Sequence, residues 1–138
     1  MAKMTTITNV SLDELNITED LANAMLDAKG AIIVQKEREA AASTFKQHTG
    51  NLANSFTLNK TLKKDKSGRY YKSVSPVGVH HIGKNGKSIS NAEVAFVQNY
   101  GAPQRNIKAT HFIDKANDAA EAEATAAAEE VFNEYIKE

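Results

Sequence analysis

Two long segments without proline, one near each end of the chain, most constrain the possible fold. The first runs from Thr18 to Gln47 and is rich in Ala, Glu, Lys and Leu, which are good helix formers. It predicts one long helix, although Gly30 inside it costs about 1 kcal/mol relative to alanine. Its apolar residues form two stripes offset around the axis, so the helix either bends or contacts different partners along its length. The stripes are Leu21, Met25, Ala28 and Ile32, then Val34, Ala41 and Phe45.

The second segment predicts a C-terminal helix from Phe112 to about Lys137. Apolar residues recur along one side at helical spacing, and acids occupy the other sides. Many of these apolar residues are alanines, which let two helices approach closely. We therefore expect this helix to pack on the long first one. The apolar stripe consists of Phe112, Ala116, Ala119, Ala120, Ala124, Ala127, Val131 and Tyr135.

The middle of the chain predicts β-strands. From Phe56 to Leu62, apolar and polar residues alternate, as in a half-buried strand. Asp65 to Gly68 has the composition of a hairpin turn. A return strand is expected from Arg69 to about Val79, with Pro76 at an edge or in a bulge. The residues expected on one face of this strand are Tyr71, Val77 and Val79.

A short third helix is expected after Ser90. Ser90 and Glu93 have the spacing of a capping box, and Gly101 supplies a stop. A polar, basic loop then runs to Ala109, and Thr110 can cap the helix that opens with Phe112. Val94, Val97 and Tyr100 recur at helical spacing within the short helix. Together the elements predict an α+β sandwich, with a long N-terminal helix and a C-terminal helix packed on a small antiparallel sheet.

Length and composition suit one domain over residues 1–138. The chain has no cysteine, which fits synthesis in a reducing cytoplasm and excludes disulfides, thiol catalysis and cysteine-ligated zinc. Its N-terminus lacks the apolar run of a signal peptide, and no segment approaches the roughly 20 apolar residues of a membrane span. We expect a soluble, cytosolic chain without a membrane partner.

The formal net charge of zero conceals a strong segregation. Lys60 to Lys87 carries eight basic residues and one acid, hence +7, whereas Thr110 to Glu138 carries eight acids and two lysines, hence −6. One reading is head-to-tail association, in which the basic region of one copy meets the acidic helix of the next. The alternative is that both are solvated faces or neutralise each other within one molecule. The basic residues are Lys60, Lys63, Lys64, Lys66, Arg69, Lys72, Lys84 and Lys87.

Three chemical motifs occur only in incomplete form. Gly78 to Lys84 fits a P-loop except that Asn85 replaces Ser or Thr, and the second near match ending at Ser88 lacks its first glycine. His80-His81 invites a metal site, but adjacent strand residues point to opposite faces. No G-x-S-x-G sequence prepares a serine nucleophile. We therefore expect no catalytic residues, no cofactor and no metal.

Three short segments carry a resemblance to a known family. They are SLDEL from Ser11, TGNLANSF from Thr49, and AEVAFVQNYG from Ala92 followed by the start of the last helix at Phe112. In this order they resemble the head-tail joining, or tail-completion, proteins of long-tailed double-stranded DNA bacteriophages. That family often has an acid where Gln98 and Asn99 stand here, and its last helix commonly begins Arg-Pro-Phe. SLDEL by itself also predicts a capped helical turn.

The resemblance implies a structural virion protein of the neck or the head-proximal end of the tail. Its expected partners are further copies of itself in a ring of six, a connector or stopper protein, and the tail tube or tail terminator protein. In that family the structural centre would correspond to Tyr100, Gly101, Arg105 and Phe112. The basic hairpin, with Lys63, Lys64, Lys66, Arg69 and Lys72, and the Gly83 to Ser90 loop, with Lys84 and Lys87, would reach neighbours or the DNA channel. The protein would occupy the host cytoplasm during assembly.

Nucleic-acid binding is the alternative from a different class. Between Lys63 and Lys72 the sequence places basic side chains beside Tyr70 and Tyr71, a composition able to hold phosphates and stack bases. No recognition helix or RNA-binding signature accompanies it, and the sequence pI of about 6.9 argues against a dedicated binder. A small nucleic-acid-binding protein that uses the basic hairpin within residues 60–87 therefore remains a separate hypothesis.

Overall fold

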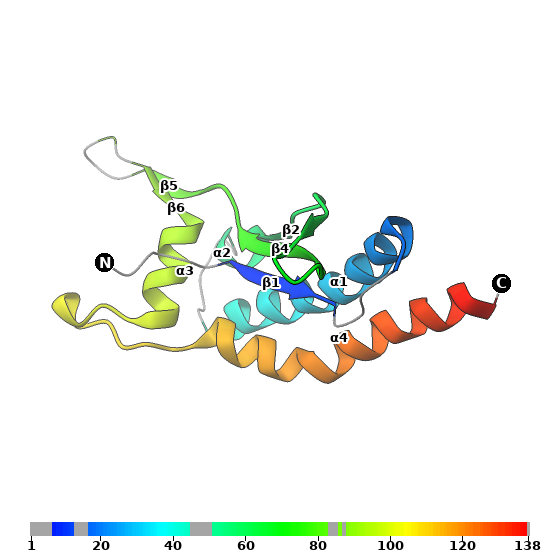
Figure 1. Cartoon of the computed structure of the whole chain (residues 1–138). Coiled ribbons are helices and arrows are strands. Elements are labelled where there is room, and N and C mark those ends of the chain that lie inside the picture. The colour runs from blue at the N-terminus through cyan, green and yellow to red at the C-terminus, as the bar shows by residue number, and fades with distance from the viewer. Residues whose placement is uncertain (1–6, 13–16, 45–50, 83–85, 87, 138) are drawn as a thin grey trace.

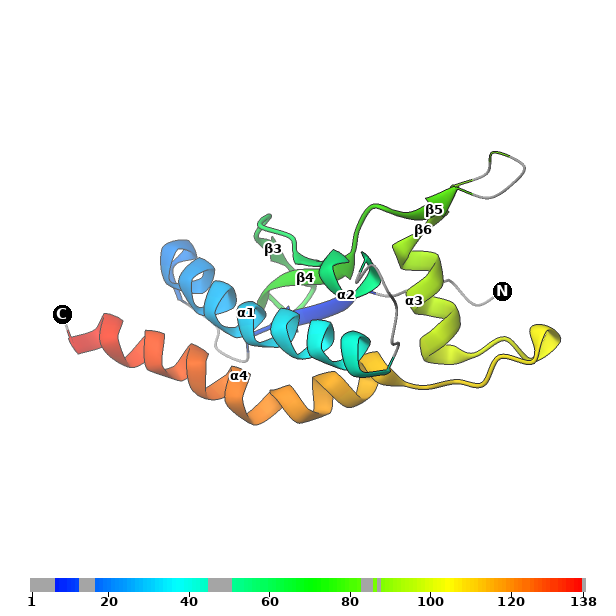
Figure 2. The same cartoon turned by 180° about the vertical axis from the view of Figure 1, so that it is seen from behind.

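A computed structural model of the chain describes residues 7–12, 17–44, 51–82, 86 and 88–137. Helix α1 (Glu19–Thr44) and helix α4 (Phe112–Lys137) run side by side along the length of the molecule (Figure 1). A small antiparallel sheet lies against α1, and its strand near the N-terminus also reaches α4 (Figure 2). Two long helices, a small sheet and a short third helix confirm the predicted α+β class.

The main sheet is built around one central strand, β4 (Tyr70–Pro76). Strand β1 (Thr8–Ser11) pairs antiparallel with one edge of β4, and Val10 lies opposite Lys72. Strands β2 (Phe56–Leu58) and β3 (Lys63–Lys64) pair antiparallel with the other edge. The predicted hairpin is therefore present, and its first strand is interrupted between β2 and β3.

The principal core lies between α1, α4 and the sheet. Alanines of α4 are buried against larger side chains of α1, and Val10 and Val74 of the sheet close the cluster. Its buried residues are Val10, Leu12, Leu21, Ala22, Met25, Leu26, Ile33, Val74, Ala120, Ala124 and Ala128. The predicted packing of α4 on α1 through alanines is thus confirmed, although Ala119 and Tyr135 of the predicted stripe are exposed.

Helix α1 continues without a break through Gly30, and the structure explains why a glycine stands there. A Cβ atom at Gly30 would lie 2.7 Å from the Leu58 side chain. The missing side chain therefore lets β2 approach the helix closely. The sequence predicted a continuous helix but offered no reason for this glycine.

The predicted buried face of β4 was wrong. Lys72, Val74 and Pro76 are its buried residues, whereas Tyr71 is only partly buried and Val77 is exposed. The strand as a whole is central, but the pairing with β1 ends at Val74, so in the described structure its last residue, Pro76, is paired only with Phe56 on the β2 side, which fits the predicted edge position. Side chains alternate along a strand, so the buried face contains every second residue, here Lys72, Val74 and Pro76. The sequence pattern missed this face because one of its residues is a lysine.

A second, separate hairpin follows β4. Gly78, at φ 84°, ends the expected long strand. Strand β5 (Val79–Ile82) then pairs antiparallel with β6 (Ser88–Ser90), which falls where a flexible loop was expected. The hairpin extends from the body of the molecule near α3 (Asn91–Tyr100) (Figure 1). Val79 therefore does not belong to the main sheet.

Two expected features lie partly outside the described residues. The SLDEL turn begins at Ser11, which ends β1, and residues 13–16 are not among those described. Residues 45–50, which include the predicted helix end and Gly50, are likewise outside them. After them comes a one-turn helix, α2 (Asn51–Ser55), where only a corner was expected. Its Leu52 is buried in a second cluster, as predicted for a residue that packs back under α1.

A buried carboxyl group joins β1 to the two long helices. Glu37 of α1 has no exposed surface, and its Oε2 accepts a 2.7 Å hydrogen bond from the Thr8 hydroxyl. Asn117 of α4 donates to the same hydroxyl oxygen at 3.1 Å. Burial raises the pKa of Glu37 to about 7, against hydrogen bonds from Thr8 and Asn117 that lower it. The group is therefore protonated in the folded protein at mildly acidic pH.

Glu37 should make stability fall as pH rises. Because the folded pKa of about 7 lies above the ordinary 4.5, the stabilisation is complete below pH 4.5 and is lost as pH rises through 7, a difference of about 3 kcal/mol. Glu37→Gln keeps the size of the side chain and an acceptor for Thr8 but cannot ionise. Urea unfolding between pH 5 and 8 should show a flatter profile for this variant. Exposed Glu123→Gln is the control, and equal slopes in both variants would contradict the assignment.

Candidate interaction surface

The β3–β4 hairpin presents four of the predicted basic residues to solvent. Lys63, Lys64, Lys66 and Arg69 are all exposed. Lys64 Nζ lies 4.9 Å from the centre of the Tyr70 ring, within range of a cation–π interaction. The hairpin therefore combines four exposed cationic groups with one aromatic ring that contacts Lys64.

Asp65 orders the turn that carries these cations. Its Oδ1 accepts hydrogen bonds from the Ser67 hydroxyl at 2.7 Å, the Ser67 amide at 2.9 Å and the Arg69 amide at 3.0 Å. The Ser67 hydroxyl contributes most to lowering the Asp65 pKa below its ordinary value, followed by the Arg69 amide. A single acid thus acts as a structural part of the turn.

Lys72 does not belong to this exposed surface, contrary to the prediction. Its side chain is 1% exposed, and Nζ forms a 2.7 Å ion pair with Asp27 of α1. Lys60 lies 3.8 Å from the same Asp27 oxygen but is 77% exposed. Burial of an ammonium group requires a close counter-charge, and Asp27 supplies it from 45 residues away. The spacing of the residues within the hairpin gave no indication of the ion pair between Lys72 and Asp27.

Several predicted contact residues fall outside the described part of the chain. Lys84 and Lys87 are among the undescribed residues. Arg105 lies in the short 3-10 helix η1 (Pro103–Arg105), but its side chain is not described. Their predicted contacts stay predictions.

The opposite charges of the hairpin and of α4 do not neutralise each other within the described structure. The ion pairs found there are Lys36–Glu39, Lys60–Asp27, Lys72–Asp27 and His111–Asp114. The acids of α4 are exposed, namely Asp114, Asp118, Glu121, Glu123, Glu129, Glu130 and Glu134. Both charged faces therefore remain open to partners or to solvent.

The start and stop of α3 agree with the sequence prediction, but its buried face does not. The Ser90 hydroxyl accepts a 3.1 Å hydrogen bond from the Glu93 amide, as a capping box requires. The fully buried residues are Asn91, Ala95 and Asn99. Tyr100 is 46% exposed, and its ring lies 4.9 Å from that of Phe96. The apolar pattern did not identify the buried face of α3, because two of the three residues on that face are asparagines.

Asn99 connects α3 to the start of α4. Its side-chain oxygen accepts a 3.0 Å hydrogen bond from the Ile113 amide, and its Nδ2 donates to Asp114 at 3.3 Å. The Asn99 backbone oxygen also accepts from the His111 amide at 3.0 Å. An asparagine of one helix therefore satisfies amides at the beginning of another. The predicted cap, Thr110, makes only a longer 3.4 Å contact with the Phe112 amide.

Hydrogen bonds link the two sides of the loop between these helices, both at its base and further out. The Gln98 carbonyl accepts from both the amide and the hydroxyl of Thr110, at 2.9 and 2.8 Å. Further out, Ala102 and Ile107 exchange hydrogen bonds of 2.9 and 3.1 Å. We name residues 101–109 the projecting loop, because they extend beyond α3 and α4 in both views (Figures 1 and 2).

Gly101 and Phe112 have structural roles at the two ends of the projecting loop. Gly101 adopts φ 82°, and a Cβ there would meet the Ala109 backbone nitrogen at 2.8 Å. Phe112 is 2% exposed and packs edge-on against Phe56, with ring centres 6.1 Å apart. A shallow groove of about 720 Å³ borders the loop. It is lined by Tyr100, Gly101, Pro103, Asn106, Ile107, Lys108 and Ala109.

Replacement of Gly101 should destabilise the protein more than replacement of another glycine with positive φ. Gly101→Ala combines an unfavourable φ with a clash against backbone atoms, and should lower the free energy of unfolding by about 3 kcal/mol. Gly68→Ala is the matched control, because Gly68 has φ 91° and no atom lies within 4 Å of the place that its new methyl group would occupy; it should cost about 1 kcal/mol. Denaturant unfolding measures both. Equal losses of unfolding free energy in the two variants would exclude a contribution from the close approach of the Ala109 backbone to Gly101.

Within the described ranges, no group of three or more His, Asp or Glu side chains is arranged to hold a metal ion. Each helix there is too short or too polar to cross a bilayer. Comparison of the chain with protein-family models, with curated proteins and with solved structures finds no match.

Proposed function

We propose that this protein is a structural component of a long-tailed phage virion that joins the DNA-filled head to the tail, as part of a ring. The proposal starts from the three sequence segments that resemble the head-tail joining family. It gives the protein no catalytic role and no cofactor. The partners would be further copies of the chain, a connector or stopper protein on the head side, and the tail tube or terminator protein on the other.

The observation that best supports this proposal is the unit formed by α3, the projecting loop and the start of α4. The residues quoted for the resemblance, from Ala92 to Gly101 and at Phe112, lie in this unit. Asn99 and Gly101 hold it in one shape through hydrogen bonds and close backbone contact. An ordered loop that extends from the body suits a contact with a neighbouring protein, because little conformational entropy is lost on binding.

The charge distribution gives a second, independent support. A basic hairpin and an acidic helix are both exposed, and they are not paired with each other in the described structure. Complementary surfaces on one chain favour head-to-tail association, which closes into a ring when the rotation between copies allows it.

Deletion of the gene from its phage or prophage should leave heads and tails unjoined. Electron microscopy of the lysate should show full heads beside complete, unattached tails, since each part assembles without its joint. Restoring the gene on a plasmid is the control and should restore joined virions. Normal virions from the deletion strain would exclude the joining function.

Nucleic-acid binding is the second candidate, and the exposed hairpin favours it. Lys63, Lys64, Lys66 and Arg69 are exposed on the hairpin, and Lys64 lies over the Tyr70 ring. Such a surface could bind phosphates in solution or line a channel through which DNA passes. The two candidates differ in whether the isolated chain binds nucleic acid strongly.

If the hairpin binds DNA, affinity should fall steeply with salt. The double variant Lys64→Ala/Lys66→Ala removes two of the four exposed cations, so the slope of log K against log salt should decrease in magnitude by about 1.4 to 1.8. Fluorescence anisotropy with labelled single- and double-stranded oligonucleotides measures this slope. Lys115→Ala on α4 is the control that removes a positive charge elsewhere. Absent binding at low salt, or a slope unchanged by the double variant, would exclude this role for the hairpin.

A further inference from the structure

We propose that the C-terminal end of α4 of one copy docks into a groove between α1 and β2 of the next copy. This inference rests on the ring proposed above and identifies a contact that would build it. The occupant of the groove is thus a second copy of this chain, and the contact joins two different surfaces.

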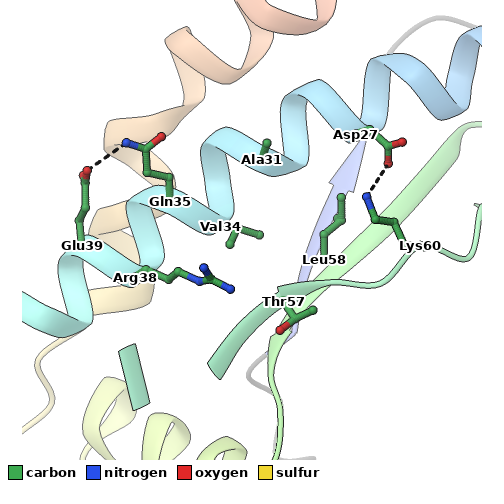
Figure 3. Close-up of a pocket in the computed structure, with 9 residues that line it drawn as sticks. All are labelled: Asp27, Ala31, Val34, Gln35, Arg38, Glu39, Thr57, Leu58 and Lys60. Atoms are coloured by element: carbon green, nitrogen blue, oxygen red, sulfur yellow. Dashed lines mark hydrogen bonds and ion pairs between the residues drawn. The ribbon is translucent and has the colours of Figure 1, made fainter. Parts of the chain in front are cut away.

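The groove has an apolar floor and a charged rim. It measures about 460 Å³ and lies between one face of α1 and the outer edge of β2 (Figure 3). Ala31 and Val34 of α1 and Leu58 of β2 form the floor, with the charged side chains around it. The polar and charged lining residues are Asp27, Gln35, Arg38, Glu39, Thr57 and Lys60.

A side chain, rather than a strand, is the form of partner that fits. The Arg38 guanidinium donates to the Phe56 backbone oxygen through Nε at 3.0 Å and Nη2 at 2.7 Å. This occupies a carbonyl group at the edge of β2 that an added strand would need. Continuous backbone pairing along this short strand is therefore blocked, while the apolar floor stays accessible to an inserted side chain.

The rim can receive negative charge. Both acids on it already have partners, since Asp27 binds Lys72 at 2.7 Å and Glu39 lies near Gln35 and Lys36. Lys60 is 77% exposed and 3.8 Å from Asp27, so this pair holds it weakly. Lys63 and Lys64 follow Lys60 along the chain and are also exposed. Positive charge therefore continues from the rim onto the basic hairpin.

The end of α4 has the complementary composition. Tyr135 and Ile136 are 50% and 61% exposed, although Phe132 one turn earlier still packs on the core. The acids Glu130 and Glu134 are exposed on the same two turns. In Figure 1 this end of the helix, drawn in red, extends past the beginning of α1. Exposed aromatic and aliphatic side chains flanked by acids suit an apolar groove that has the exposed Lys60 on its rim and whose own acids are already paired.

A chain cannot fill its own groove with this helix end. α1 lies between α4 and the strand β2 that borders the groove, in both views (Figures 1 and 2). The two surfaces are also different, so each copy offers one groove and one helix end. Such a heterologous contact repeats from copy to copy and either closes into a ring or continues as a filament.

Engineered cysteines can test this contact cleanly, because the chain has none of its own. Ala31→Cys marks the groove, Ile136→Cys marks the helix end, and both positions are exposed. Mixing the two variants under mild oxidation should give a disulfide-linked heterodimer at a yield well above that of Ala31→Cys mixed with Ala122→Cys, an exposed control on α4. The double variant Ala31→Cys/Ile136→Cys should give a ladder of covalent multimers on denaturing gels.

Other outcomes would overturn the contact. Cross-linking no better than the Ala122→Cys control, both in the purified mixture and in particles assembled with both variants, would exclude it, as would a dominant link between two Ile136→Cys chains. The gene-deletion experiment distinguishes the absence of this contact between copies from the absence of the proposed joining function. Unjoined heads and tails without the cross-link would leave the joining role and reject this interface. A specific cross-link with normally joined virions would keep the interface and reject the joining role.

Discussion

Close packing of α4 on α1 is the contact on which the rest of the structure depends. Ala120, Ala124 and Ala128 are almost completely buried at four-residue spacing, and their small side chains let the two helices approach along most of their length. The sheet packs on α1 beside this contact, and Gly30 lets Leu58 of β2 approach the helix closely. Burial of Glu37 at the junction with β1 makes this arrangement sensitive to pH, because the charged form is poorly solvated there.

The same arrangement determines where binding surfaces can form. Since α1 is covered on two sides, the exposed features lie at its margins: the basic hairpin beyond β2, the projecting loop beyond α3, and the final turns of α4. Asn99 and Gly101 hold the loop through contacts with the α4 start and with Ala109. These exposed features are the surfaces that the proposed role in assembly would use.

The sequence predicted most elements whose signals are local. The capping pair Ser90 and Glu93, the stop at Gly101 and the turn from Asp65 to Gly68 were all readable from a few adjacent residues. The candidate surface was only partly predictable. Exposed cations of the hairpin were identified, whereas Lys72 was assigned to the surface although its ammonium is buried against Asp27.

The sequence by itself therefore determined the two long helices, the hairpin and the α+β class, because helix propensity, apolar periodicity and turn chemistry act over short distances. Only the tertiary structure decided which faces are buried. Lys72, Asn91 and Asn99 are polar residues that a periodicity argument places outside. They become stable inside through partners such as Asp27 and Ile113, which are distant along the chain and meet them only when the elements pack.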